Sequence, residues 1–413
     1  MTAPDISIAD LDPVEAKRII QAVGGPGQPP VYGYQFFTAG IGDYLSTIEN
    51  EYLADSVYHG GSAFKLIVGT YGGGKTHFLY CVRGISWDYD YVSSYIELKP
   101  DETPFYNLES VYKEVVASLL YPQDPKSLQE GYDKGIEAVI KTWYYRKTQG
   151  ILENKSEKEQ QEIIKNILST LGPYESTSYL YAIKHAFSSL HKNDEESFNL
   201  IVQWLKGEKP SAAEMKKFQI TQKLDKSTAF KFLKCLIRWL KEIGYSGLIV
   251  LMDEAEQTPS MSSKQKEKLM GNLRELVDAC SSGDKVKNSM FFYAVPDESF
   301  LEGSGVVYVA LKDRLSTVFE GARNPAGIKI YLERTGDDTT AISNLIEIGE
   351  KLALIYEKAY QFKLDNPALK TRISDVAKKA YEDKHAEISY KRLFVQEIIK
   401  NFHAMKAASL AAS

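Results

Sequence analysis

A glycine-rich segment at residues 69–76 has the residue types and the spacing of a phosphate-binding loop. It reads GTYGGGKT, with glycines at both ends of a four-residue spacer and then a lysine and a threonine. Glycines let successive backbone N–H groups curve around a phosphate, and the lysine brings a positive charge to the outer phosphates. The threonine hydroxyl is the expected ligand of Mg²⁺. The segment therefore predicts a site for ATP and Mg²⁺, whose contacting residues we expect to be Gly69, Tyr71, Gly72, Gly73, Gly74, Lys75, Thr76 and His77.

A second pair of chemically active residues follows a strand-like segment far downstream. Residues 247–252 read GLIVLM and are followed by Asp253 and Glu254. A carboxylate at the carboxyl end of a central parallel strand can order the shell of a metal ion, and the next residue can polarise the attacking water. An acidic pair after a strand is also typical of a solvated loop, but the P-loop upstream favours the functional interpretation. We therefore predict that Asp253 contributes to the Mg²⁺ site with Thr76, that Glu254 is the general base, and that Lys75 is catalytic.

The elements around these motifs predict an α/β fold. Residues 64–68 (FKLIV) form an apolar run typical of a buried parallel strand, and residues 76–83 favour a helix because they contain no Gly or Pro. The start of that helix would direct its positive end at the phosphates. Further strands are expected at 91–98, 247–252, 288–295 and 328–332, and helices at 108–120, 157–171, 264–279, 340–362, 366–379 and 390–407.

These elements predict a P-loop NTPase with a parallel five-stranded sheet, a large helical insertion and a C-terminal helical lid. The segment 107–245 is too long for the ordinary helix that joins two strands, so we interpret it as the insertion. The predicted parts are an N-terminal helical segment packing on the core (1–59), the core (60–106 and 246–332), the insertion (107–245) and the lid (333–413).

The composition excludes several classes of protein. The chain has 413 residues, a net charge of −5 and three widely spaced cysteines, which we expect to be buried thiols in a reducing compartment. There is no apolar run of about 20 residues and no basic, apolar start typical of a signal peptide. We therefore expect a cytoplasmic protein that contacts no membrane.

Positive charge is concentrated inside the predicted insertion. Between residues 206 and 241 there are ten Lys or Arg against three Asp or Glu. Two interpretations are open: the solvated face of an amphipathic helix, or a surface that contacts the backbone of double-stranded DNA or of RNA. The residues concerned include Lys216, Lys217, Lys223, Lys226, Lys231, Lys234 and Arg238.

Beyond the generic P-loop, the extended sequence resembles one family. The run GGSAFKLIVGTYGGGKTHFLYCVR at 60–83, with FTAG at 37–40 and AKRII at 16–20, resembles the BrxD-type ATP-binding proteins of BREX phage-defence loci. The similarity extends from about Asp12 to Met405. It implies an AAA+ ATPase related to the origin-recognition and helicase-loader group, which uses a catalytic glutamate and an additional strand between its two motifs.

The AAA+ resemblance also implies two further site residues, and it raises the question of a third. Arg314, near the start of a segment at 311–319, is the candidate for an arginine finger offered to a neighbouring subunit, or else a surface residue paired with Asp313. Arg392, at the start of the last helix, lies where such lids carry a second sensor arginine, or else it is a surface residue at the start of a helix. The strand tip that usually carries a polar sensor has Pro296, so either Asp297 or no residue takes this role.

The function expected from these features is that of a Mg-dependent ATPase in a prokaryotic defence system, acting as a homo-oligomer. ATP turnover would assemble it on DNA, or load or control a partner such as a helicase or modification enzyme. The alternative is a slow-turnover, ATP-gated switch or scaffold that acts through protein contacts of the insertion.

Overall fold

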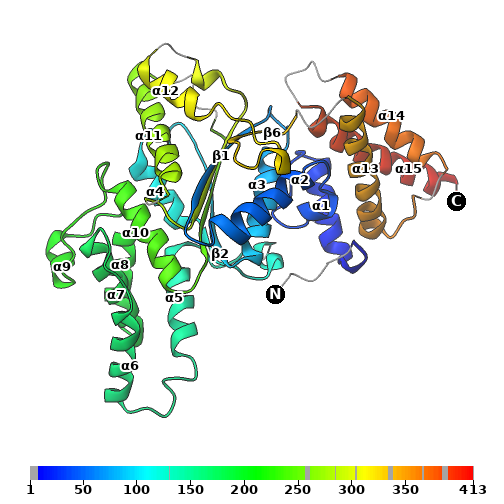
Figure 1. Ribbon diagram of the computed structural model, residues 1–413. Helices are drawn as coiled ribbons and strands as arrows, with labels where there is room; N and C mark the ends of the chain where they lie inside the picture. Colours follow the sequence, from blue (N-terminus) through cyan, green and yellow to red (C-terminus); the bar gives the residue numbers. More distant parts are fainter. Residues whose placement is uncertain are drawn as a thin grey trace.

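The protein is built around a six-stranded sheet whose strands lie in the order β3-β2-β4-β5-β1-β6 (Figure 1). The computed structural model describes residues 8–129, 131–255, 261–283, 285–302, 305–333, 338–364, 367–383 and 389–412. Five strands are parallel, and β3 runs antiparallel to β2 at the edge. The strands are β1 (Ser62–Val68), β2 (Tyr91–Glu97), β3 (Leu119–Leu120), β4 (Gly247–Asp253), β5 (Ser289–Val295) and β6 (Lys329–Tyr331).

The sixth strand corrects the prediction of a five-stranded, wholly parallel sheet. Sequence periodicity predicts a helix through residue 120, but the helix ends at Ala117, and Leu119 and Leu120 pair with β2 instead. Both leucines are buried. A short apolar run fits a buried strand and a buried helical turn equally well, so periodicity could not separate the two.

The helices are distributed over both faces and both ends of this sheet. They are α1 (Pro13–Gly24), α2 (Gly42–Thr47), α3 (Lys75–Asp88), α4 (Leu108–Ala117), α5 (Gly135–Thr148), α6 (Glu157–Ser169), α7 (Thr177–His191), α8 (Glu195–Leu205), α9 (Ala212–Lys217), α10 (Ala229–Glu242), α11 (Ser263–Ser281), α12 (Val306–Arg314), α13 (Asp338–Tyr360), α14 (Leu369–Glu382) and α15 (Tyr390–Ala412). Short 3-10 segments are η1 (Ile8–Asp10), η2 (Tyr34–Phe37), η4 (Pro125–Gln129), η6 (Ser299–Leu301) and η7 (Gly321–Arg323), and η3 (Ile48–Ser56) is a π-helix.

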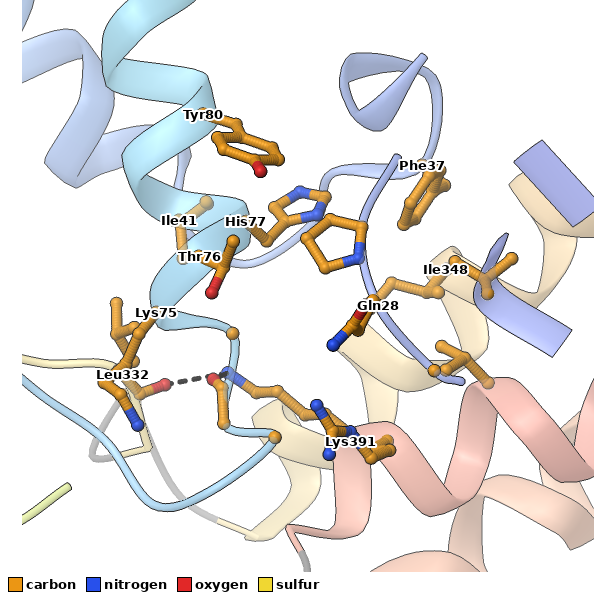
Figure 2. A pocket seen from close by; sticks show the side chains of 18 of the residues that line it. Gln28, Phe37, Ile41, Lys75, Thr76, His77, Tyr80, Leu332, Ile348 and Lys391 are labelled. Atoms are coloured by element: carbon orange, nitrogen blue, oxygen red, sulfur yellow. Dashed lines mark hydrogen bonds between the residues drawn. The ribbon is translucent and has the colours of Figure 1, made fainter. Parts of the chain in front are cut away.

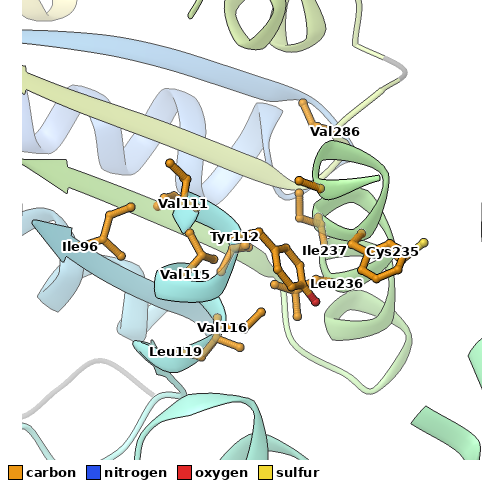
Figure 3. Packing of buried hydrophobic residues seen from close by; sticks show 14 of the residues in the cluster. Ile96, Val111, Tyr112, Val115, Val116, Leu119, Cys235, Leu236, Ile237 and Val286 are labelled. Carbon is orange, nitrogen blue, oxygen red and sulfur yellow. The ribbon is translucent and has the colours of Figure 1, made fainter. Parts of the chain in front are cut away.

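Successive side chains of a strand point to opposite faces of the sheet, so the hydrophobic core has a part on each face. In β4, Leu248 and Val250 belong to one buried cluster, whereas Ile249 and Leu251 belong to the cluster on the opposite face. This is the two-residue period of a strand covered on both sides. Helix α3 covers one face with η3, and α4, α10 and α11 cover the other. Figure 3 shows α4 and α10 packed together through side chains such as Tyr112 and Leu236.

Helices α5 to α9 extend away from one end of the sheet (Figure 1). They do not form a separate core, because Trp143 on α5 and Phe187 on α7 belong to the same buried cluster as the strand residues. The two rings lie 4.3 Å apart between centroids. The insertion therefore shares its hydrophobic core with the sheet.

The C-terminal helices α13, α14 and α15 pack together on the opposite side of the molecule (Figure 1). Their core includes α1, since Ile19 and Ile20 are buried with Leu352 and Phe394. The predicted N-terminal segment is thus divided: α1 packs on the C-terminal helices, whereas η3 packs on the sheet. The division of the chain into four parts remains a prediction.

Two expectations from composition concern the state of the cysteines and the presence of membrane-spanning helices. Cys81, Cys235 and Cys280 are buried free thiols, as predicted. Within the described ranges, no helix is both long enough and apolar enough to cross a membrane.

Candidate functional site

The P-loop has the backbone conformation that its glycines predict. It connects the end of β1 to the start of α3, and Gly72 and Gly74 have φ angles of 82° and 98°. Residues with a side chain rarely adopt this left-handed conformation. At Gly72 there is also no room, because an added Cβ would lie 2.9 Å from the Cβ of Arg392. The loop therefore requires glycine at both positions.

Lys75 is buried and lies across its own loop. Its Nζ donates to the carbonyl oxygens of Gly69, at 2.8 Å, and of Thr70, at 3.1 Å. The ammonium group is thereby held at the mouth of the loop, where phosphate oxygens could replace these carbonyls as acceptors. Gly69 does not line the cavity itself, but its carbonyl oxygen accepts a hydrogen bond from Lys75 Nζ.

The carboxylate of Asp253 connects several groups of the site by accepting their hydrogen bonds. Its Oδ2 accepts hydrogen bonds from the Thr76 hydroxyl, at 2.6 Å, and from the Tyr95 hydroxyl, at 2.9 Å, and its Oδ1 accepts from the Glu254 backbone N–H. Asp253 is 1% exposed. Burial, and then the charge of Asp253, raise the pKa of Tyr95, so this phenol keeps its proton and remains a donor. The geometry joins Thr76 and Asp253, the two residues predicted to hold Mg²⁺.

Glu254 stands at the end of β4 in an unusual backbone conformation. Its φ is +56°, in the left-handed region, and the residue is exposed beside the cavity. A non-glycine residue in this region costs on the order of 1 kcal/mol and is found preferentially at functional sites. The strained conformation therefore supports a functional position for the residue that follows Asp253.

These groups surround a cavity of about 220 Å³ with two chemically different ends (Figure 2). The polar end contains Tyr71 to His77, Asp253, Glu254, Lys391 and Arg392. The apolar end lies between the N-terminal segment and helices α13 and α15, and contains Val23, Phe37, Leu345, Ile348 and Val395. A polar end for phosphates and an apolar end for a base match the two halves of a nucleotide.

The start of α15 contacts the P-loop directly, through residues that the sequence did not indicate. The Ser389 backbone N–H donates to the Tyr71 carbonyl, and Lys391 Nζ donates to the carbonyls of Gly73, at 3.2 Å, and Leu332, at 2.9 Å. The bond to Leu332 is drawn in Figure 2. Burial lowers the pKa of Lys391 to about 8, although the negative charge of Glu333 opposes this.

Glu333, two residues after β6, connects the P-loop with the residue that precedes α15. Its carboxylate accepts from the Thr70 backbone N–H and hydroxyl, and from the Ser389 hydroxyl. No strand or helix pattern marks Glu333, and Lys391 lies in the predicted helix 390–407 without a motif that marks it as a site residue. The signal that could have found Lys391 is its place beside Arg392, in the basic pair at the start of the last predicted helix.

Arg392, the predicted sensor, also lines the cavity. Its guanidinium lies over the Tyr71 ring, with 4.7 Å from Cζ to the ring centroid. Its Nε is buried and has no hydrogen-bond partner among the described residues. A buried donor without a partner is costly, and a ligand oxygen could satisfy it.

Two other predicted residues lie away from this cavity. Arg314 hydrogen-bonds to Asp278 on α11 and, at 2.8 Å, to the carbonyl of Ala310, so the carboxylate that it pairs with is that of Asp278 and not that of Asp313. Asp297 is exposed and accepts a hydrogen bond from the Ser299 backbone N–H. Neither residue lines the cavity of its own chain.

Comparison with known proteins identifies the family. The family model described as BREX system ATP-binding protein BrxC/D matches residues 11–409, which is nearly the whole chain. No curated protein and no solved structure gives a significant match. The matched segment includes the P-loop, the Asp253–Glu254 pair and the basic pair of α15. The chain therefore belongs to the family of BREX system ATP-binding proteins, BrxC/D.

Proposed function

We propose that this protein is a Mg-dependent ATPase of the AAA+ type acting in a BREX phage-defence system. The single observation that carries the proposal is the convergence of Lys75, Thr76, Asp253 and Glu254 on one cavity that also has an apolar end. The sheet order supports the AAA+ assignment, because β5 lies between β1, the strand that leads into the P-loop, and β4, the strand that ends in Asp253.

Each polar residue has a distinct role in this proposal. Lys75 leaves the carbonyls of its loop and binds the outer phosphates. Thr76 and Asp253 hold the metal, and because the hydroxyl proton of Thr76 already points at Asp253, its oxygen lone pairs remain available. When bound, Mg²⁺ supplies charge neutralisation on the phosphates. Glu254 accepts the proton of the attacking water.

The first test is the loss of nucleotide binding in Lys75→Ala. Removing one partner of a buried charged contact costs about 2 kcal/mol or more, so ATP affinity should fall by about 30-fold or more. Equilibrium titration with ATP and Mg²⁺ measures this. The matched control is Lys358→Ala, a lysine on α13 that donates to the Ala9 carbonyl away from the cavity, which should keep wild-type affinity. Equal affinities for the two variants would contradict the P-loop assignment.

The lowered pKa of Lys391 gives a pH-dependent prediction. A lysine with a pKa of about 8 is charged below that pH and loses its proton above it. If the charged form binds phosphate, ATP affinity should fall as pH rises from about 7.5 to about 9.5, by at most about tenfold per pH unit. Lys391→Arg stays charged over this range and should bind with little pH dependence.

Lys400→Arg serves as the matched control, since Lys400 lies on the same helix but is 79% exposed in its side chain. It should reproduce the wild-type profile. Identical pH profiles for wild type and Lys391→Arg would exclude a role for the Lys391 charge.

We further propose that the basic part of the insertion contacts DNA. Lys216, Lys217, Lys223 and Lys226 are exposed, whereas Lys234 pairs with Glu175, and Arg238 pairs with Glu242. The four lysines around α9 are therefore the ones best placed to reach phosphates.

Changing these four lysines to Glu should weaken DNA binding and flatten its dependence on salt, with the log–log slope falling by about 0.9 for each phosphate that the variant no longer neutralises. Basal ATP turnover should not change. Binding titrations at several salt concentrations measure the slope, and wild-type protein without DNA affinity at low salt would favour a protein partner instead. Slow turnover that DNA does not stimulate would favour the alternative, an ATP-gated switch.

A further inference from the structure

The carboxylate of Glu333 accepts hydrogen bonds from two parts of the chain that are far apart in the sequence. Its Oε2 accepts from the Thr70 backbone N–H, at 3.1 Å, and its Oε1 accepts from the Thr70 hydroxyl, at 2.7 Å. Oε1 also accepts from the hydroxyl of Ser389, at 3.0 Å. Ser389 is 5% exposed, so water has little access to its side chain. One carboxylate thus holds the second residue of the P-loop and the residue before α15 together.

This carboxylate contacts the P-loop from outside the cavity. Glu333 does not line the cavity, and its Oε1 lies 3.1 Å from the position that a Cβ on Gly73 would occupy. The Thr70 carbonyl in turn accepts from the Gly73 backbone N–H, at 2.9 Å, and from Lys75 Nζ, at 3.1 Å. The position of Thr70 therefore affects both the turn of the loop and the ammonium group of Lys75.

Ser389 connects the carboxylate to the first turn of α15. Its hydroxyl donates its single proton to Glu333 and accepts from the Lys391 backbone N–H, at 3.4 Å. Its carbonyl accepts from the Arg392 backbone N–H, at 3.1 Å, and its own N–H donates to the Tyr71 carbonyl, at 3.0 Å. These bonds hold the backbone from which the side chains of Lys391 and Arg392 reach the cavity.

The two cationic side chains at the start of α15 are placed to bind an anion beside the P-loop. Lys391 Nζ donates to the Gly73 carbonyl, at 3.2 Å, and the Nε of Arg392 is buried without a partner among the described residues. A triphosphate offers more anionic oxygens than a diphosphate, and hydrogen bonds between charged groups are strong. These two side chains can therefore distinguish the two nucleotides.

Resting on the proposed nucleotide site, we propose that Glu333 is a positioning residue for the terminal phosphate of a nucleoside triphosphate. It does not touch the nucleotide itself. By binding Thr70 and Ser389 with one carboxylate, it keeps Lys391 and Arg392 at the distance from the P-loop at which they reach the γ-phosphate. The protein then prefers a triphosphate to the diphosphate, and loss of the carboxylate weakens this preference.

The test compares the affinities of a non-hydrolysable ATP analogue and of ADP, each with Mg²⁺, by equilibrium binding. Wild type should prefer the analogue. Glu333→Ala should lower the ratio of the two affinities by about tenfold, the effect of losing about one hydrogen bond to a charged group. The affinity for ADP should change little, because Lys75 and the N–H groups of the loop bind the phosphates that both nucleotides share.

Variants of the two donor residues test whether the carboxylate acts through them. Thr70→Val and Ser389→Ala each remove one hydroxyl and should lower the ratio, whereas Thr70→Ser keeps the hydroxyl and should retain most of the preference. Because Ser389→Ala and Glu333→Ala break the same connection, the double variant should be no worse than Glu333→Ala alone. Thr70→Val and Ser389→Ala decide the question by themselves if Glu333→Ala does not fold.

Glu357→Ala is the matched control for a purely structural effect. The Glu357 carboxylate also accepts from a backbone N–H, that of Leu364, at 2.8 Å, and it pairs with Lys363, but it does not line the cavity. Its loss should lower the melting temperature and leave the ratio of affinities unchanged.

The outcomes separate this inference from the proposed function. If wild type binds neither nucleotide, both are overturned. If wild type binds nucleotide and the ratio is the same in Glu333→Ala, or falls equally in Glu357→Ala, the role of Glu333 alone is overturned. Effects of Ser389→Ala and Glu333→Ala that multiply in the double variant would also exclude the shared connection.

Discussion

Glu254→Gln should bind ATP with nearly wild-type affinity and hydrolyse it about 10²- to 10⁴-fold more slowly. The substitution keeps the size of the side chain and removes only its ability to accept a proton, a step that contributes about 10² to 10⁴ in rate. The carboxylate of Asp253 would keep its bonds to Thr76 and Tyr95, so the metal site should not be disturbed. Single-turnover hydrolysis together with equilibrium binding measures the two effects separately.

The backbone of Glu254 provides a control for this experiment. Because its φ is +56°, some substitutions act through strain rather than through chemistry. Glu254→Asn is well suited to the left-handed conformation, since asparagine adopts it readily. It should match Glu254→Gln in turnover, because neither accepts a proton. Wild-type turnover in Glu254→Gln would refute the assignment of the base.

The central sheet could be predicted from the sequence because its strands are short apolar runs with punctuating turn residues. The predicted run 247–252 corresponds to β4 (Gly247–Asp253), and 91–98 corresponds to β2 (Tyr91–Glu97). The C-terminal helices could also be predicted, although α15 continues to Ala412. The prediction was wrong at Leu119–Leu120, where local pattern could not reveal that β2 has a free edge to be paired.

Residues of the site could be predicted only where they stand together in one short sequence motif. The spacing of the P-loop determines the places of Lys75 and Thr76, but the contacts of Lys391 and Glu333 depend on how α15 packs against the loop. This arrangement joins Thr70 to Glu333, after β6 and 263 positions away, and Gly73 to Lys391 of α15, 318 positions away. No local signal encodes it, so the sequence indicates only Arg392.

The predicted role of Arg314 as an arginine finger requires that the protein forms an oligomer. On α12, Val306 and Val309 are 83% and 53% exposed, so this helix has side chains at the surface that a neighbouring chain could contact. Arg314 ends this helix and is bound to Asp278. As a finger offered to a neighbouring subunit, it would leave Asp278 and bind the neighbour's γ-phosphate.

If this is correct, Arg314→Ala should lower turnover by about 10³-fold or more while ATP affinity of the isolated subunit stays nearly intact. A purely structural pair predicts something different: Arg314→Ala and Asp278→Ala would both loosen α12 from α11, and their effects on turnover would be similar and small. Asp278→Ala is therefore the matched control, because it breaks the same bond and leaves the finger in place.

Mixing experiments test whether the residue acts between subunits. Lys75→Ala supplies an intact Arg314 but a dead nucleotide site, so adding it to Arg314→Ala should restore turnover at the intact sites if the two variants assemble together. Concentration-dependent recovery would show that sites are shared between chains. A normal rate for Arg314→Ala, at concentrations where the protein is oligomeric, would contradict the finger. Arg314 would then only connect α12 to α11 through its ion pair with Asp278. The γ-phosphate would have to be stabilised from within one chain, by Lys391 or Arg392.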